Sequence, residues 1–212
     1  MRIAVYPGSF DPLHIGHQAI MEYLTREKAF DWVYLVISPQ NPFKEPAKAL
    51  SAERRYRDAI AAVRPHPELH VWVDNIELSM DPPHYTIRTL DALHRREPEN
   101  EFTLVIGADN LEGLLNWRDS TRILTEYGVA VYPRTGYDID RIQSFLYEKM
   151  LVLPSPYALD STSYHDLPGT VGFEDIDQLY RIEVIDAPIV DISSTRIREG
   201  LANGEDMSIW MM

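Results

Sequence analysis

The chain has 212 residues, of which 45% are hydrophobic, and a formal net charge of -13 at pH 7. A chain of this size can bury one substantial core, so we expect a single domain over residues 1–212. The negative charge disfavours nucleic acid as a partner, because proteins bind its phosphates largely through Lys and Arg. No cysteine is present, which excludes thiol catalysis and disulfides. Without an apolar stretch of roughly 20 residues or a cleavage-type leader, we expect a cytoplasmic protein that does not bind membranes.

A strand, a helix and a second strand are predicted at the start of the chain. Apolar runs at 3–6 and 32–37 stop at Pro-Gly and Ser-Pro, as buried strands do. Apolar residues between them fall at helical spacing, which predicts a crossover helix over about 15–28. These three segments predict one strand-helix-strand unit.

The alternation continues with two more helices and two more strands. Ser51 is placed to cap a helix that stops at Pro65, and Thr86 is placed to cap the next one. Strands are predicted at about 70–73 and at 102–106. The expected inner faces of the two helices consist of Tyr56, Ala59, Ile60 and Val63, and of Ile87, Leu90 and Leu93.

The second half of the chain repeats this pattern less regularly. Its predicted elements are a helix at 109–127, a strand at 129–132, a helix at 138–150, an irregular excursion at 154–172, a strand at about 182–185 and a helix at about 194–202. Asn203 and Gly204 are suited to end the last helix. We therefore expect no linker between two domains.

Alternating strands and helices predict the fold class. It is a doubly wound α/β fold with a mostly parallel sheet, helices on both faces and a Rossmann-like nucleotide-binding topology. Ligands in such folds lie at the carboxyl ends of the strands, where the strand order reverses. The loops that follow residues 3–6 and 102–106 are therefore the places to look for a site.

The loop after the first strand has the residues of an anion site, in the string GSFDPLHIGH at 8–17. Gly8 permits a tight turn, and the backbone N–H groups of Ser9 and Phe10 can approach a ligand near the positive end of the following helix. His14 and His17 are three residues apart and can donate ring N–H groups to phosphate oxygens. A His pair alone is also compatible with a surface pair or a capping histidine.

This string resembles the signature of the HxGH nucleotidyltransferase superfamily, whose members transfer a nucleotidyl group and release pyrophosphate. The resemblance implies that His14 and His17 bind the triphosphate and that His17 stabilises the transition state at the α-phosphorus. It also implies ATP contacts by Gly8, Ser9 and Phe10. Nucleotidyl transfer needs in-line positioning and neutralisation of charge on phosphate oxygens, and such donors suit that need.

A second string, ISSTRIR at 192–198, begins the last predicted helix. Taken alone, it could be a helix cap followed by surface arginines. It resembles the second superfamily signature, ISSTxIR, within a C-terminal helical segment at about 190–212. The resemblance implies that Ser193, Ser194, Thr195 and Arg198 bind the β- and γ-phosphates, with Arg198 as a catalytic residue.

Asp109 follows the fourth predicted strand, within the string IGADNL at 106–111. Its carboxylate could accept hydrogen bonds from ribose hydroxyls, or it could cap the helix that begins beside it. The string resembles the IGxDxL segment of nicotinate mononucleotide adenylyltransferases. That resemblance implies that Asp109 contacts the ribose of ATP.

Four further segments resemble the same branch, at 38–44, 83–90, 116–118 and 131–137. The resemblance implies that Trp117 stacks on the pyridine ring of the acceptor and that Lys44 meets its phosphate, although each could instead be an ordinary core or surface residue. An aromatic face suits a flat cationic ring, and a lysine suits a phosphate. The expected acceptor-binding residues are Asn41, Lys44, Tyr85, Thr86, Trp117 and Arg134.

The expected reaction joins ATP and nicotinate mononucleotide, with Mg²⁺ carried by the ATP phosphates because no carboxylate cluster suggests a dedicated metal site. The Pro7-Gly8-Ser9 start is instead typical of phosphopantetheine adenylyltransferases, which is the main alternative. A non-catalytic nucleotide-binding protein is a second. The HIGH motif also occurs in class I aminoacyl-tRNA synthetases, but a KMSKS-like loop is missing and the charge opposes tRNA. The sequence leaves the oligomeric state open, a homo-oligomer included.

Overall fold

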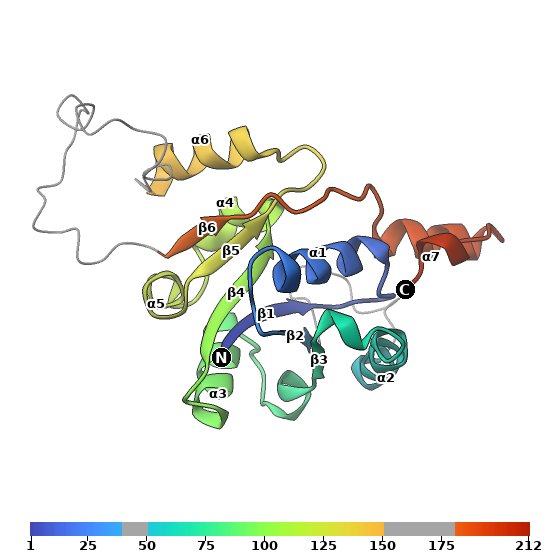
Figure 1. Ribbon diagram of the computed structural model, residues 1–212, viewed down its shortest axis with the longest axis horizontal. Coiled ribbons are helices and arrows are strands. Elements are labelled where there is room, and N and C mark those ends of the chain that lie inside the picture. The colour runs from blue at the N-terminus through green and yellow to red at the C-terminus, as the bar shows by residue number, and fades with distance from the viewer. Residues whose placement is uncertain (40–50, 151–180) are drawn as a thin grey trace, which may run out of the picture.

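A six-stranded parallel sheet forms the centre of the molecule (Figure 1). The computed structural model describes residues 1–39, 51–150 and 181–212, with the backbone alone at 147–150. The strands are β1 (Arg2–Gly8), β2 (Trp32–Ile37), β3 (Val71–Asp74), β4 (Glu101–Gly107), β5 (Val129–Tyr132) and β6 (Ile182–Val184). Their order is β3-β2-β1-β4-β5-β6, so the direction of winding reverses between β1 and β4. The doubly wound α/β prediction is confirmed.

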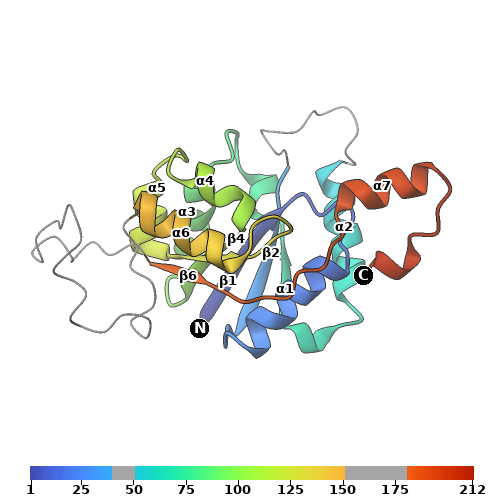
Figure 2. The same ribbon diagram turned by 90° about the horizontal axis from the view of Figure 1, so that it is seen from above.

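Helices cover both faces of this sheet (Figure 2). They are α1 (Ile15–Arg26), α2 (Ala52–Val63), α3 (Thr86–Arg96), α4 (Leu111–Leu114), α5 (Ser120–Arg122), α6 (Ile139–Met150) and α7 (Ser194–Ala202). Shorter 3-10 turns lie at Pro67–Leu69, Ile76–Ser79, Ala108–Asn110 and Ser208–Trp210, and a π-helical turn lies at Ile123–Tyr127. In the part of the chain that the structure describes, no helix is long and apolar enough to cross a bilayer.

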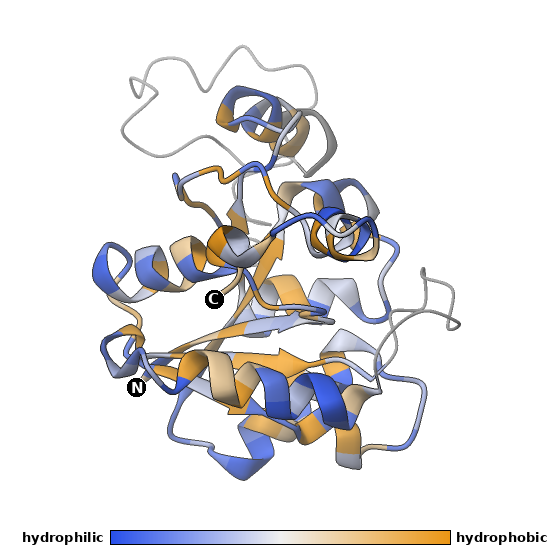
Figure 3. Cartoon of the chain, turned by 90° about the vertical axis from the view of Figure 1, so that its right-hand side faces the viewer, coloured by the Kyte–Doolittle hydropathy of each residue, from blue (hydrophilic) through white to orange (hydrophobic). Residues whose placement is uncertain are grey.

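Two hydrophobic cores result from the alternation of side chains along the strands. Ile3 and Val5 of β1 face the core under α3, α4 and α6, whereas Ala4 and Tyr6 face the core under α1 and α2. Figure 3 shows the apolar residues along the strands and on the inward sides of the helices. Burial of both faces explains why the strands read as continuous apolar runs in the sequence.

Three local predictions were wrong in detail. The helix expected over 109–127 is broken into a 3-10 turn, α4, α5 and the π-helical turn. Tyr85, not Thr86, occupies the N-cap position of α3, and its side chain makes no capping hydrogen bond. Ile60 of α2 is 40% exposed, while Arg55 takes a place on the buried face with Ala59 and Val63. The irregular excursion predicted at 154–172 lies outside the described residues.

Candidate active site

The loop between β1 and α1 places two histidines against each other. His14 has an extended backbone at the N-cap of α1, and its N–H donates to Nδ1 of His17 at 3.2 Å. The two rings are stacked, with their centroids 3.6 Å apart and their planes 25° apart. The predicted pair is therefore brought together by the first turn of one helix.

Hydrogen bonding and burial fix the protonation state of this pair. Because Nδ1 of His17 accepts a hydrogen bond, the neutral ring carries its proton on Nε2, which is then a donor. Burial, with a smaller contribution from charge repulsion by Arg134, lowers the pKa of His14 to about 4. Burial also lowers the pKa of His17, with smaller effects from His14 and Arg134. Both imidazoles are therefore neutral at pH 7.

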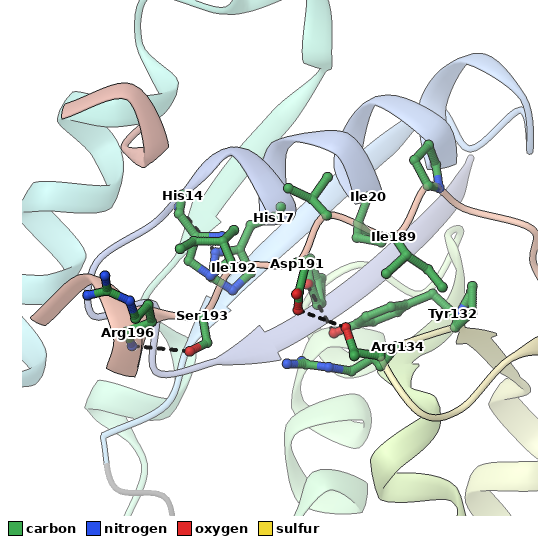
Figure 4. Close-up of a pocket in the computed structure, with 16 residues that line it drawn as sticks. His14, His17, Ile20, Tyr132, Arg134, Ile189, Asp191, Ile192, Ser193 and Arg196 are labelled. Carbon is green, nitrogen blue, oxygen red and sulfur yellow. Dashed lines mark hydrogen bonds between the residues drawn. The ribbon is translucent and has the colours of Figure 1, made fainter. Parts of the chain in front are cut away.

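A cavity of about 420 Å³ opens beside the histidines (Figure 4). It lies between the first turns of α1, the loop after β5 and the segment that leads into α7. Figure 2 shows that segment running beside α1 toward α7. The lining consists of Tyr6, His14, Gly16, His17, Ile20, Tyr132, Pro133, Arg134, Thr135, Pro188, Ile189, Val190, Asp191, Ile192, Ser193 and Arg196.

Arg134 and Asp109 meet at the point where the strand order reverses. Nε of Arg134 lies 3.8 Å from Oδ1 of Asp109, and Arg134 also lines the cavity with His14 and His17. Asp109 sits inside the 3-10 turn after β4 and does not cap a helix. Arg134, which we expected at the acceptor, thus lies beside residues that we expected to bind ATP.

Gly107 leaves the space that this ion pair fills. A Cβ atom at Gly107 would lie 2.5 Å from Oδ1 of Asp109 and 2.7 Å from Cδ of Arg134. Gly107→Ala should therefore displace Arg134 and raise the KM for ATP about tenfold, because charged contacts of this kind contribute about 1.5–3 kcal/mol. Steady-state kinetics would measure the change. The control is Gly113→Ala on α4, where the nearest atom to the added Cβ would be in the side chain of Trp117, at an ordinary contact distance of 3.8 Å. An unchanged KM would show that Arg134 does not contact ATP.

The N-terminus of α7 packs against the loop between β1 and α1. Ser193 caps α7 by accepting from the N–H of Arg196 at 3.2 Å, and Ser194 Oγ donates to the carbonyl of Pro12 at 2.9 Å. Arg198 donates to the carbonyl of Asp11 at 2.5 Å and to Oγ1 of Thr195 at 3.1 Å. Ser193 lines the cavity, Ser194 and Arg198 connect α7 to the loop, and Thr195 accepts a hydrogen bond from Arg198.

The remaining predicted residues that the structure describes do not line this cavity. Gly8 and Phe10 pack against each other inside the loop between β1 and α1. Phe10 is 4% exposed, and its ring would lie 2.8 Å from a Cβ atom at Gly8. Ser9 turns its carbonyl toward Arg55. Tyr85 is exposed, and Trp117 is half-buried against the core under α4. Thr86 begins α3 and is half-buried, while Asn41 and Lys44 fall outside the described residues.

Several residues of the site were not predicted. Tyr6 and Tyr132 line the cavity, and their two hydroxyl groups are 3.2 Å apart. Thr135 donates to Asp191 at 3.0 Å and so connects the loop after β5 to the segment before α7. Tyr6 and Tyr132 each precede a proline at the carboxyl end of a strand, a shared position from which they could have been predicted.

The comparisons with known proteins cover nearly the whole chain. The cytidylyltransferase-like family model matches residues 5–200. A probable nicotinate-nucleotide adenylyltransferase of Bacteroides fragilis is 34% identical over 210 residues, which are 99% of this chain and 87% of that protein. The chain belongs to the nicotinate-nucleotide adenylyltransferase family. A relative of the same name from Porphyromonas gingivalis is 33% identical over 100% of this chain and 89% of its own length.

The fold of this family member is shared with solved structures. Nicotinic acid mononucleotide adenylyltransferase of Plasmodium falciparum complexed with NaAD aligns over 99% of this chain and 90% of that chain. The TM-score is 0.70 and the sequence identity is 16%. At this identity the likeness concerns the fold. Family membership itself rests on the sequence relatives and on the family model.

The buried histidine pair should make the stability of the protein depend on pH. An unfolded histidine titrates at its ordinary pKa of about 6.5, but folded His14 titrates at about 4, so the unfolded state binds more protons between these values. The free energy of unfolding should therefore decrease as the pH falls from about 6.5 toward 4. Urea unfolding at several pH values would measure it, and the variant His14→Asn/His17→Asn should show a smaller decrease. An equal decrease in both proteins would contradict a neutral, buried pair.

Proposed function

We propose that this chain transfers the adenylyl group of ATP to nicotinate mononucleotide and releases pyrophosphate. One observation carries the proposal: in a member of this family, two neutral histidines at the start of α1 face a cavity that Arg134 and the N-terminus of α7 also border. Such a site offers N–H donors, a cation and a helix N-terminus to a polyphosphate. Synthesis of a pyridine dinucleotide is the corresponding role in NAD biosynthesis.

The reaction is an in-line displacement at phosphorus. An oxygen of the acceptor phosphate forms a bond with the α-phosphorus of ATP, and the bond between that phosphorus and the bridging oxygen breaks to release pyrophosphate. No protein base is required, because the acceptor phosphate is already ionised. His17 donates from Nε2 to oxygens on which charge grows in the transition state, and a preorganised donor in a buried site stabilises that charge strongly.

The other predicted residues have roles within this proposal. Asp109 would accept from the ribose hydroxyls of ATP, and Arg134 would approach the phosphates from the opposite side of the cavity from α7. Trp117 would stack on the pyridine ring. The expected contacts of Ser193, Ser194, Thr195 and Arg198 with the β- and γ-phosphates, and of Asn41, Lys44, Tyr85 and Thr86 with the acceptor, belong to the same proposal.

Mg²⁺ enters this reaction as part of the ATP substrate. Among the residues that the structure describes, no three His, Asp or Glu side chains gather closely enough to hold a metal ion. Of the carboxylates near the site, Asp109 pairs with Arg134, Asp11 pairs with Arg198, and Asp191 accepts a hydrogen bond from Thr135. These contacts support a Mg²⁺ ion that is held mainly by the ATP phosphates and by water.

The single sheet supports one catalytic domain over residues 1–212, which we propose together with a cytoplasmic location.

The test of the acceptor is a pyrophosphate-release assay with ATP and one of three acceptors: nicotinate mononucleotide, nicotinamide mononucleotide or phosphopantetheine. We expect the highest kcat/KM with nicotinate mononucleotide. A preference for phosphopantetheine would overturn the acceptor, as the Pro7-Gly8-Ser9 start would then indicate, but would leave the ATP site in place.

A further inference from the structure

A buried arginine on α2 holds the carboxyl ends of β1 and β2. Arg55 is 2% exposed, and its Nη1 donates to the carbonyl of Ser9 at 2.5 Å. Its Nη2 donates to the carbonyls of Ser38 at 2.7 Å and Pro39 at 3.1 Å. Hydrogen bonds from a charged donor are shorter and stronger than neutral ones. Arg55 therefore fixes the peptide groups of two loops at once.

Phe10 connects one of these peptide groups to the histidines. Its φ of 44° lies in the left-handed region, which a residue other than glycine adopts only where its surroundings enforce it. Its ring meets the ring of His17 edge-on, with the centroids 5.0 Å apart and the planes at 77°. The Ser9–Phe10 peptide is planar, so holding the Ser9 carbonyl also holds the Phe10 nitrogen. Arg55 thus reaches His17 through two residues.

We propose that Arg55 is a positioning residue for nucleotidyl transfer, because it fixes the Ser9–Phe10 peptide and thereby the ring of His17. This inference rests on the proposed function of His17 as the donor to the reacting phosphate. In the trans Ser9–Phe10 peptide, the carbonyl and the N–H point in opposite directions. Because the carbonyl of Ser9 faces Arg55, the N–H of Phe10 faces away from Arg55. Arg55 acts through the loop and does not contact the substrate.

A direct role of Arg55 in phosphate binding does not fit its contacts. Its guanidinium is occupied by three carbonyl oxygens, and it does not belong to the lining of the cavity. The other side of the loop is held separately, since Arg198 and Ser194 of α7 donate to the carbonyls of Asp11 and Pro12. A change at Arg55 should therefore disturb His17 while the contacts of α7 stay in place.

The test compares Arg55→Met and Arg55→Lys with the control Arg54→Met, whose residue is exposed on the same helix and pairs with Asp58. The first readout is kcat and the KM for ATP, normalised to the folded fraction. We expect kcat of Arg55→Met to fall on the order of tenfold with little change in KM, since misplacement by about 1 Å costs up to about 10²-fold. Arg55→Lys keeps the positive charge but loses the planar guanidinium, so its kcat should lie between those of the wild type and Arg55→Met.

The second readout is the ¹⁵N NMR signal of the His17 ring without substrate. Wild type and Arg54→Met should show a neutral ring with the proton on Nε2 down to acidic pH, whereas Arg55→Met should show a mixture of tautomers and a pKa closer to 6.5. A folded Arg55→Met with wild-type kcat and a wild-type His17 signal would overturn the inference. If Arg55→Met does not fold, the same two readouts on Arg55→Lys decide.

Failure of the proposed function gives a different result. If wild type released no pyrophosphate with any acceptor, the reaction would be wrong, but the NMR signal would still report whether Arg55 sets the His17 ring. If wild type were active and the His17 signal did not respond to either Arg55 variant, the positioning role alone would be wrong.

Discussion

Replacing His17 with alanine is expected to lower kcat by about 10² to 10³ while the affinity for ATP changes little. The reason is the direction of its ring. Nδ1 accepts the N–H of His14, so Nε2 carries the proton and supplies a donor whose position the fold has already fixed. A donor of this kind stabilises the transition state more than the ground state, and its loss is therefore seen in kcat. Steady-state kinetics and calorimetric binding of ATP would separate the two effects.

The matched control is His94→Ala, because His94 is exposed on α3, on the other face of the sheet. Its kcat should equal that of the wild type. His17→Ala also removes an acceptor at the start of α1, which should cost about 1 kcal/mol of stability. Assays are therefore made well below the unfolding temperature of each variant. Near-normal turnover in folded His17→Ala would show that His17 does not stabilise the transition state.

Arg134→Met is expected to reduce kcat/KM for ATP by about 10²-fold. Arg134 lines the cavity together with two neutral histidines, so its guanidinium is placed to meet phosphates bound beside them. Hydrogen bonds from a charged group contribute about 1.5–3 kcal/mol each, and methionine replaces the length of the side chain without the charge. Arg134→Lys should recover part of the loss, since it restores the charge without the two-pronged geometry.

The control for this variant is Arg141→Met. Arg141 is more than half exposed, pairs with Glu112 and lies over the ring of Tyr137, so it shares the region but not the cavity. Arg141→Met should leave the KM for ATP and the KM for the acceptor unchanged. A rise confined to the KM of the acceptor in Arg134→Met would restore the assignment made from the sequence, in which Arg134 binds the acceptor and not ATP.

Strand patterns and the two signature strings were sufficient to predict the sheet and the histidine pair. Strands buried on both faces are apolar throughout, and their stop at Pro or Gly marks the edge where ligands bind. His14 and His17 could be paired from their spacing within one helical turn. Local signals of this kind do not depend on tertiary contacts.

Features that depend on tertiary contacts could not be predicted in the same way. Arg55 lies at helical spacing with Ala59 and Val63, but charged residues are seldom fully buried, so the apolar pattern favours Ile60. The carbonyls that satisfy Arg55 come from two loops elsewhere in the chain. The helix expected over 109–127 is similarly interrupted at Asp119, whose φ of 51° is left-handed, while Trp117 beside it packs against the core. Helical periodicity alone shows neither which carbonyls a buried arginine meets nor where a helix is interrupted.

In the proposed reaction the α-phosphate of ATP, with its adenosine, passes to the phosphate of nicotinate mononucleotide. The most direct measurement incubates the purified chain with nicotinate mononucleotide and ATP labelled at either the α- or the γ-phosphate, and then identifies the labelled products. We predict that the α-label appears in the dinucleotide and the γ-label in pyrophosphate. Recovery of the γ-label in a phosphorylated acceptor, or of the α-label in free AMP alone, would contradict adenylyl transfer.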